Sequence, residues 1–542
     1  MFACWGCRPS RMVVLAFVVL ATCGSFAAPE SSRYFKIKVV DEQTGRGVPL
    51  VELKTTNSIC YYTDSNGIVA FYEPGLMNQK VFFSVQSHGY AFPKDGFGFA
   101  GKTLDVKEGG SAELKIKRAN IAERLYRITG EGIYRDSVLV GERAPIQKPL
   151  LNAQVVGQDS VLAVPWREKI YWFWGDTSRV RYPLGQFQTS GATSLPPDRG
   201  GLDPSAGVDL TYWTDADGFS KKMCPTKDAG LMWLDGILIA PDADGRERMI
   251  AHYARMKSLG EMLEHGLAIW DEQEEIFKKH TEFELNDKWR CPRAHPIRSK
   301  ENGTEYFLFP TPYVTARVKA DLTHLADQSS YEAFTCLAAG SRYSQANAKV
   351  ERDAAGKLVW GWKADTDFVD GVREDELIKA DQIKPDEARD QLRDVETQKA
   401  VVLHSGSINW NAWRKKWIII AVQVLGTPSF LGEVWFAEAD SPTGPWRYAK
   451  KIVTHDKYTF YNPVQHPFFD QDGGRVIYFE GTYANTFSGN PDQTPRYNYN
   501  QIMYRLDLSD PRLRPPLAPA KTTSADAAAT SPTVSKASAK SD

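Results

Sequence analysis

Two aspartates near the start of the long central region have the residue type and spacing that acid–base chemistry requires. Asp159 stands within residues 158–160 (Gln-Asp-Ser), and Asp176 follows 17 residues later within 174–177 (Trp-Gly-Asp-Thr). Because Asp176 follows an aromatic run that reads as a strand, a turn and a return strand would bring both carboxylates to one edge. Such a pair can supply the acid and the base or nucleophile that cleave a glycosidic bond. A Gly-Asp turn is the structural alternative for Asp176.

Two glutamates in the last third of the chain are further candidates for the same chemistry. Glu433 follows the turn-like segment 427–432, and Glu480 ends the apolar run 476–479. A carboxylate at the end of a hydrophobic strand can have a raised pKa, as a general acid requires. A structural ion pair is the alternative for each. We predict that Asp159, Asp176, Glu433 and Glu480 converge at one site, and that at least one stays protonated near neutral pH.

Several other side chains have the chemistry of substrate binding. Two histidines each precede a proline, in 293–296 and 461–467, and a histidine bonded to the backbone is the structural alternative for both. Arg179, close behind Asp176, or His466 would keep one of the four carboxylates ionised. The expected binding residues are Arg179, His295, Trp410, Tyr461 and His466.

Metal and cofactor motifs are missing from the sequence. It contains no His-Glu-x-x-His and no Walker loop, and Gly96–Gly101 matches Gly-x-Gly-x-x-Gly only by letter. His404 and Ser405 are adjacent, but without Gly-x-Ser-x-Gly they do not indicate a serine hydrolase. We expect no cofactor and no metal at the site, with an axial ion near His404 as the one exception and a packed histidine as the alternative.

The elements that must position these residues follow a repeated all-β pattern. Aromatic or β-branched runs end at a polar residue five times, at 170–174, 249–253, 306–309, 417–422 and 476–479. Five such units predict a five-bladed β-propeller over 151–508, with a pair of sandwiches as the alternative. A charged insertion at about 349–399 separates the third and fourth units, and its segments 374–380 and 386–392 read as exposed helices.

The segment before this region has a different organisation. Short alternating strands over 33–118 predict a small β-sandwich, and 119–150 reads as a linker and lead-in. Residues 41–49 and 63–67 resemble the turns of the prealbumin-like (carboxypeptidase regulatory-like) sandwich. That resemblance implies an accessory or spacer module. The acidic turn 64–67 lacks the later carboxylates of a calcium loop and is interpreted as a turn.

The central region also resembles a known family. Asp159, the Trp-Gly-Asp-Thr segment around Asp176 and the late His-Pro resemble the five-bladed propeller glycosidases, within them the family that includes endo-acting D-arabinofuranan hydrolases. The resemblance implies that a pair of aspartates in the first blade carries catalysis, and Asp159 and Asp176 match that pair. It implies a glycoside hydrolase acting on a polysaccharide or oligosaccharide. A non-catalytic carbohydrate-binding propeller and a surface scaffold that binds a protein are the alternatives.

Composition and charge exclude other classes. The 542 residues carry 66 Lys and Arg against 67 Asp and Glu, a net charge of −1, and 12% aromatics. The balance gives no basic footprint for nucleic acid. Mean hydropathy is −0.40, and the mature chain has no apolar run long enough to span a membrane. Composition therefore argues against a nucleic-acid-binding protein and a polytopic membrane protein, and the many aromatic residues suit core packing as well as stacking on sugar rings or nucleobases.

The two ends of the chain read as segments outside the folded domains. Basic residues, the apolar run 12–21 and Ser25-Phe26-Ala27 predict a signal peptide over 1–27 and hence a periplasmic or extracellular protein. A lipoprotein anchored through Cys23 is the less favoured alternative. The signal peptide would remove three of the seven cysteines, and the remaining four fit free thiols or one bridge. Residues 511–542 are rich in Pro, Ala, Ser and Thr and predict a disordered tail.

Overall fold

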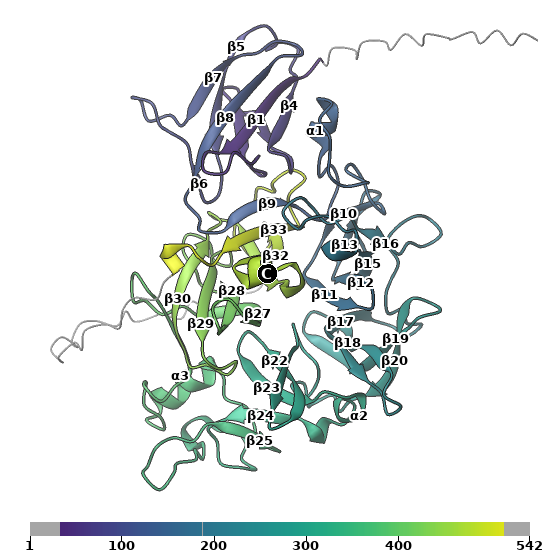
Figure 1. Ribbon diagram of the computed structural model, residues 1–542, viewed down its shortest axis with the longest axis vertical. Helices are drawn as coiled ribbons and strands as arrows, with labels where there is room; N and C mark the ends of the chain where they lie inside the picture. The colour runs from purple at the N-terminus through teal and green to yellow at the C-terminus, as the bar shows by residue number, and fades with distance from the viewer. Residues whose placement is uncertain (1–32, 187, 514–542) are drawn as a thin grey trace, which may run out of the picture.

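The N-terminal strands of the protein form a two-sheet sandwich, seen at the top of Figure 1, in a computed structural model that describes residues 33–186 and 188–513. One sheet has the order β4-β1-β8-β6 and the other β3-β2-β5-β7, with β1 and β8 parallel. Alternate residues of β5 are buried, as a strand with one face on a core requires. The strands are β1 (Phe35–Asp41), β2 (Glu52–Thr55), β3 (Cys60–Tyr62), β4 (Ile68–Phe71), β5 (Lys80–Gln86), β6 (Tyr90–Ala91), β7 (Gly101–Asp105) and β8 (Ser111–Arg118).

The predicted sandwich is confirmed in architecture, and its prealbumin-like identity stays a prediction. The predicted signal peptide lies outside the described residues, as does the predicted tail apart from its first three residues. Those three, Pro511–Leu513, form a short 3-10 turn in which the Leu513 side chain is buried. The folded part of the chain therefore extends slightly further than the composition indicated.

The rest of the described chain forms five blades of four or five mostly antiparallel strands around an axis, as Figure 1 shows. This confirms the predicted five-bladed propeller. The five runs recognised in the sequence are the second strands of their blades, which are the most apolar because strands flank them on both sides; all nine residues of β32 are buried.

The first two blades carry the candidate aspartates and their neighbours. Blade one is β11 (Val161–Trp166), β12 (Lys169–Trp174), β15 (Ser190–Ser194) and β16 (Thr211–Tyr212), accompanied by a small sheet of β10 (Val155–Gln158), β13 (Thr177–Arg179) and β14 (Tyr182–Gln186). Blade two is β17 (Leu231–Pro241), β18 (Glu247–Ser258), β19 (Glu261–Asp271) and β20 (Ile276–Glu282).

The remaining blades complete the ring. Blade three is β21 (Ile297–Glu301), β22 (Thr304–Pro310), β23 (Val314–Lys319), β24 (Glu332–Thr335) and β25 (Gly361–Ala364). Blade four is β27 (Leu403–Asn411), β28 (Lys416–Gln423), β29 (Val434–Ala439), β30 (Trp446–Val453) and β26 (Asp390–Asp394), the last parallel to β30. Blade five is β31 (Thr459–Gln465), β32 (Val476–Ala484), β33 (Asn500–Asp507) and β9 (Glu123–Arg127).

The ring is closed by a segment that the sequence had placed in the linker. Strand β9 lies within 119–150 and pairs antiparallel with β33, so blade five combines strands from opposite ends of the propeller sequence. The segment was not recognised as a strand because it is rich in charged residues. In the structure these charges have partners: Arg505 forms an ion pair with the Glu123 carboxylate, and the buried Arg124 guanidinium donates to backbone carbonyls of the sandwich. The linker prediction is therefore wrong over β9.

The charged insertion also differs from its prediction, because it contains β25 and β26, the outer strands of blades three and four. Helix α3 (Gly371–Lys379) begins at Asp370, whose side chain accepts from Arg373 N, and it matches the first predicted helix. The second predicted helix, 386–392, is absent, because its residues enter β26. The buried Glu374 carboxylate accepts from the backbone N–H groups of Arg389 and Asp390, which fixes this segment beside α3 as an extended strand.

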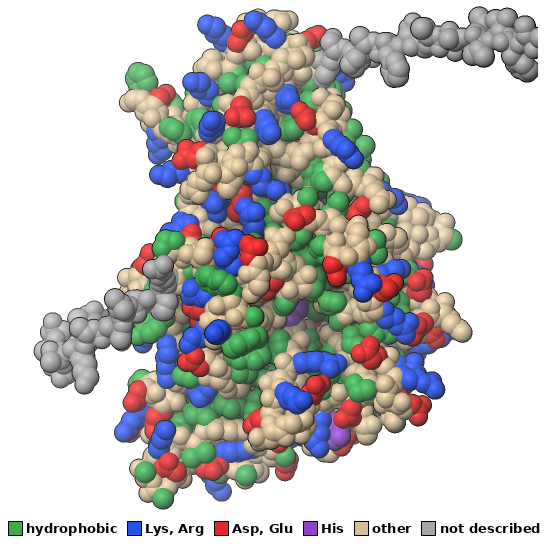
Figure 2. Space-filling view, in the orientation of Figure 1, with side chains coloured by type: hydrophobic (Ala, Val, Ile, Leu, Met, Phe, Trp, Pro, Cys, Tyr) green, Lys and Arg blue, Asp and Glu red, His purple; other side chains and the backbone are tan. Residues whose placement is uncertain are grey.

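The surface carries both signs of charge, as the charge balance of the sequence predicts. Lys and Arg side chains are intermingled with Asp and Glu over the face seen in Figure 2. Besides α3, the described helices are α1 (Arg135–Leu139) and α2 (Leu322–Leu325), and none is long and apolar enough to cross a membrane. The four cysteines within residues 33–186 and 188–513 are all free thiols, at Cys60, Cys224, Cys291 and Cys336.

Candidate active site

The two aspartates of the first blade lie side by side at one mouth of the propeller. Asp159 precedes β11 and Asp176 follows β12, so the hairpin brings them together, and the Asp159 N–H donates to the Asp176 carbonyl at 3.0 Å. A Cβ at Gly175 would lie 3.2 Å from the Asp159 Cβ. The glycine of the Trp-Gly-Asp-Thr segment thus leaves room for the Asp159 side chain against the neighbouring strand end.

The two carboxyl groups have different environments. Burial, and secondarily the charge of Asp159, raise the pKa of Asp176 from 3.8 to about 7. The Asp176 Oδ1 atom is buried without a hydrogen-bond partner in the described part of the chain. Asp159 instead accepts at Oδ1 from Ser160 N at 2.6 Å and from Ser160 Oγ at 2.7 Å. The pair therefore combines a carboxyl group that accepts two hydrogen bonds with one that keeps a proton near neutrality.

Hydrogen bonds connect Asp159 to the fourth and fifth blades. Ser405 Oγ donates to Asn462 Oδ1 at 2.7 Å, and Asn462 Nδ2 donates to Ser160 Oγ, which donates to Asp159. His404 Nδ1 lies 3.1 Å from Ser405 Oγ. Because the Ser405 hydroxyl already donates its proton to Asn462, His404 Nδ1 is the donor to Ser405 Oγ. Four polar side chains from three blades thus fix the orientation of one carboxylate.

Aromatic residues surround the same carboxylates. Tyr461 and Tyr499 are both close enough to Asp159 that its charge and a hydrogen bond, added to burial, raise their pKa values well above 10. Phe487 packs edge-on against Tyr461 with ring centroids 6.0 Å apart, and 65% of its side chain is exposed. An exposed ring beside half-buried carboxyl groups offers a face on which a sugar can stack.

Three residues around this site have left-handed backbone conformations. The φ angles are 49° at Asn462, 64° at Phe487 and 61° at Tyr499. Such angles are costly for residues with a Cβ, particularly for aromatic ones, and they concentrate at functional sites. The backbone here is therefore shaped to present these side chains rather than to minimise local energy.

Glu433 does not join the aspartate pair. Its buried carboxylate forms an ion pair with Lys451 Nζ at 2.7 Å and accepts from Thr454 Oγ1 at 2.8 Å. Burial raises its pKa despite these partners. Glu433 precedes β29, the third strand of blade four, and its partners lie on and next to the outer strand β30. The prediction that it converges with the aspartates is wrong because strand order places it further from the axis.

Glu480 is also separated from the aspartates. It lies within β32, and its Oε1 atom is 2.6 Å from His466 Nε2. His466 in turn packs edge-on against Trp172 of blade one, with centroids 5.2 Å apart. The carboxylate is near enough to Tyr126 and Tyr212 to contribute to their raised pKa values, after burial. The pair occupies the interface between blades five and one, so the predicted convergence of four carboxylates reduces to two.

Two predicted binding residues have other partners. Arg179 Nη2 forms an ion pair with Asp217 at 2.6 Å and donates to Gln154, so it does not hold a catalytic carboxylate ionised. Trp410 lies near the end of β27, against Trp417 with centroids 5.8 Å apart. Because β27 begins at the mouth that holds Asp159, Trp410 lies toward its opposite end and away from the aspartates.

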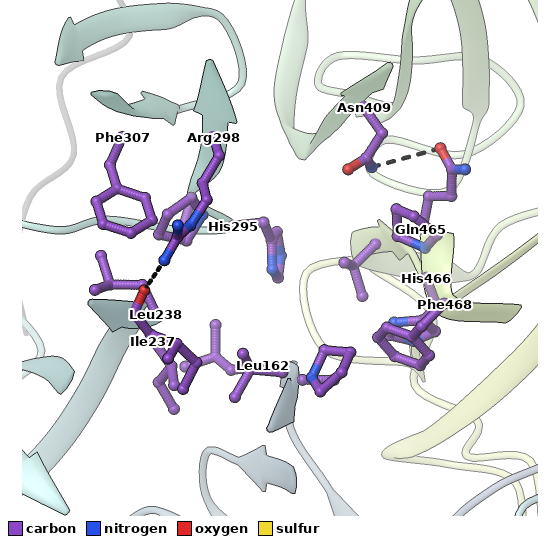
Figure 3. Close-up of a pocket in the computed structure, with 18 residues that line it drawn as sticks. Leu162, Ile237, Leu238, His295, Arg298, Phe307, Asn409, Gln465, His466 and Phe468 are labelled. Carbon is purple, nitrogen blue, oxygen red and sulfur yellow. Dashed lines mark hydrogen bonds between the residues drawn. The ribbon is translucent and has the colours of Figure 1, made fainter. Parts of the chain in front are cut away.

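His295 lies in the axial channel. A cavity of about 360 Å³ there is lined by residues of all five blades, among them Leu162, Ile237, Arg298, Asn409 and Gln465. Figure 3 shows the His295 ring pointing into the space between Arg298 on one side and His466 on the other. Burial, and then His466, lower the pKa of His295 to about 3. Neither Asp159 nor Asp176 lines this cavity, so the channel and the aspartate pair are separate features.

Sequence reasoning placed Asp159, Asp176 and Tyr461 but missed Tyr499 and Phe487. Both missed residues lie in the segment between β32 and β33, whose sequence has no strand or turn pattern that would aim it at the first blade. The only signal was its aromatic content. The axial ion near His404 stays a prediction, since the described contacts of His404 are with a hydroxyl group.

Comparison with known proteins gives distant likenesses only. No family model matches the chain, and no curated protein matches it. Similar solved structures include a putative exo-β-1,3-galactanase from Bifidobacterium bifidum (12% identity, 70% of this chain and 92% of that one, TM-score 0.32) and an α-L-arabinanase from Cellvibrio cellulosa (10% identity, 65% and 92%, TM-score 0.32).

A fungal structure is similar over a shorter part of its own length. The exo-β-1,3-galactanase from Phanerochaete chrysosporium has 9% identity and a TM-score of 0.32, with 66% of this chain and 65% of that one covered. This chain therefore spans slightly less than two thirds of that protein. The blade assignment rests on the strand pairing within the present structure, and the chemistry of the site rests on its own side chains.

Proposed function

We propose that this protein is a glycoside hydrolase that cleaves a polysaccharide or oligosaccharide with Asp176 as general acid and Asp159 as base or nucleophile. The observation that carries the proposal is the asymmetry of the pair. A pKa of about 7 leaves Asp176 protonated up to neutrality, while Asp159 accepts two hydrogen bonds from Ser160. Glycosidases use two carboxyl groups in these opposite protonation states.

In this proposal the proton of Asp176 passes to the oxygen of the leaving sugar as the glycosidic bond breaks. If Asp159 is the base, it activates a water that attacks the anomeric carbon directly. If Asp159 is the nucleophile, it attacks the anomeric carbon first and water then hydrolyses the covalent intermediate. In both cases one water adds across the bond. The chain of hydrogen bonds from His404 holds Asp159 in one orientation. Phe487 provides a stacking face for a sugar ring.

The proposal includes export of the protein, on the basis of the signal-like segment 1–27. Intact-mass measurement of the protein recovered from its exporting host tests this. A mass that retains residues 1–27 would contradict export by cleavage, and a lipid adduct on Cys23 would indicate an anchored form instead.

The catalytic proposal is tested on a panel of polysaccharides with detection of new reducing ends. We expect Asp176→Asn and Asp159→Asn each to lower turnover by at least a factor of 100, since each removes one half of the acid–base pair. Asp244→Asn, at an exposed turn of blade two, is the matched control and should keep full activity.

The pH profile separates the roles. Turnover of the wild type should decline above about pH 7 as Asp176 loses its proton. Binding of a glycan without any cleavage would reject the hydrolase in favour of a carbohydrate-binding propeller. Full activity of both aspartate variants would reject the acid and base roles given to Asp176 and Asp159.

A further inference from the structure

Two histidines and a cysteine form a buried cluster where blade two meets the segment leading into blade three. His252 lies on β18, His265 on β19 and Cys291 between β20 and β21. Their side chains are 7%, 0% and 1% exposed. One ligand atom from each lies within 4.8 Å of the other two. No part of the proposed hydrolase chemistry uses these residues.

Strand pairing places the two imidazoles on the same face of the blade. His252 is opposite Leu267, and His265 is two positions from Leu267 on the same strand, so both rings project to one side. His252 Nε2 is 3.1 Å from His265 Nδ1. That separation is close to the distance between two nitrogens bound to one metal at about 2.0–2.1 Å each.

The backbone fixes which nitrogen of His265 is available as a ligand. His265 Nε2 is 2.9 Å from the Glu284 carbonyl oxygen, which can only accept, so Nε2 carries the proton. Nδ1 therefore presents a lone pair toward His252 and the cluster. A histidine that donates its second N–H to a backbone carbonyl is the arrangement that orients imidazole ligands in metal sites.

Cys291 completes the set. Its Sγ atom is 3.5 Å from the Lys288 carbonyl oxygen, and the ring of Phe283 packs edge-on against His265 with centroids 5.7 Å apart. A thiophilic cation bound through Sγ would displace the thiol proton.

We propose that His252, His265 and Cys291 bind one thiophilic metal ion through two nitrogens and one sulfur. Two imidazole nitrogens and a thiolate sulfur are ligands that both Cu⁺ and Zn²⁺ accept. The ion would fasten the β18–β19 hairpin to the segment that enters blade three.

The test uses the full chain with Cys4, Cys7, Cys23 and the exposed Cys60 replaced by serine, so that these thiols do not compete for the ion. Metal-free protein is titrated with Cu⁺ under anaerobic conditions and, separately, with Zn²⁺, each against a competing chelator. We expect one equivalent of ion per chain and a rise in melting temperature on binding. Cys291→Ser and His265→Gln should each weaken binding at least 100-fold.

The matched control is Cys336→Ser, which removes a buried free thiol elsewhere and should leave metal binding unchanged. If Cys291→Ser fails to fold, His252→Gln is used instead. As a second readout, the Co²⁺-loaded protein should show a sulfur-to-metal absorption band that the Cys291→Ala variant lacks. Saturable binding of either ion that is lost in these variants supports the site. No stoichiometric binding, or equal binding by the variants, overturns the proposal.

Discussion

Replacing Asp176 by asparagine should change how the stability of the protein depends on pH. In the unfolded chain this carboxyl group has a pKa near 3.8, and in the folded protein burial and Asp159 raise it to about 7. Between these values the unfolded chain releases the proton while the folded protein retains it, so stability falls as pH rises. The full difference corresponds to about 4 kcal/mol. Partial solvent access to Asp176 reduces our expectation to about 2 kcal/mol.

Asparagine has the same shape and no charge, so the variant should match the wild type near pH 3, below the pKa of the unfolded chain, and exceed it by about 2 kcal/mol at pH 8. Urea unfolding at both pH values measures this. Asp64 and Asp470 also have raised pKa values, about 6 and about 7, so the wild type loses stability with pH for several reasons. The difference between variant and wild type isolates Asp176.

The exposed Asp244→Asn variant should show the same pH dependence as the wild type and serves as control. Asp159→Asn removes the neighbouring charge and should shrink the loss of stability between pH 5 and pH 8. If Asp176→Asn follows the wild-type curve at both pH values, the carboxyl group ionises normally. The acid role assigned to it would then be refuted whatever the substrate.

Three further changes test the surroundings of the pair. Gly175→Ala places a Cβ 3.2 Å from that of Asp159, so we expect turnover to drop with a stability loss of about 1 kcal/mol in urea unfolding; unchanged kinetics would count against the packing argument. Phe487→Ala should raise KM about tenfold at nearly constant kcat and melting temperature, and an unaltered KM would remove it from the binding surface. Away from the aspartates, Glu480→Ala leaves the His466 ring without its partner and should lower the unfolding free energy by about 2 kcal/mol. A stability equal to that of the wild type would show that the His466–Glu480 contact is dispensable.

The sequence alone determined the local elements and the identity of the central pair. Aromatic and β-branched runs specify strands because their side chains suit a buried pleated surface, and five such runs were enough for the blade count. Asp159 and Asp176 could be paired because they flank a single hairpin, where short-range geometry decides which residues are neighbours. The first insertion helix was equally local, since Asp370 caps it.

Only the tertiary structure decided the contacts between residues distant in sequence. Closure of the ring by β9 depends on pairing with a strand more than 370 residues away, and its charges are buried in ion pairs that no local pattern reveals. Glu433 and Glu480 resembled catalytic acids, yet their strand positions turned them toward Lys451 and His466. Tyr499 reaches Asp159 because the last blade packs beside the first. Sequence periodicity states which face of a strand is buried, whereas the partner across a blade interface is set by how the whole ring closes.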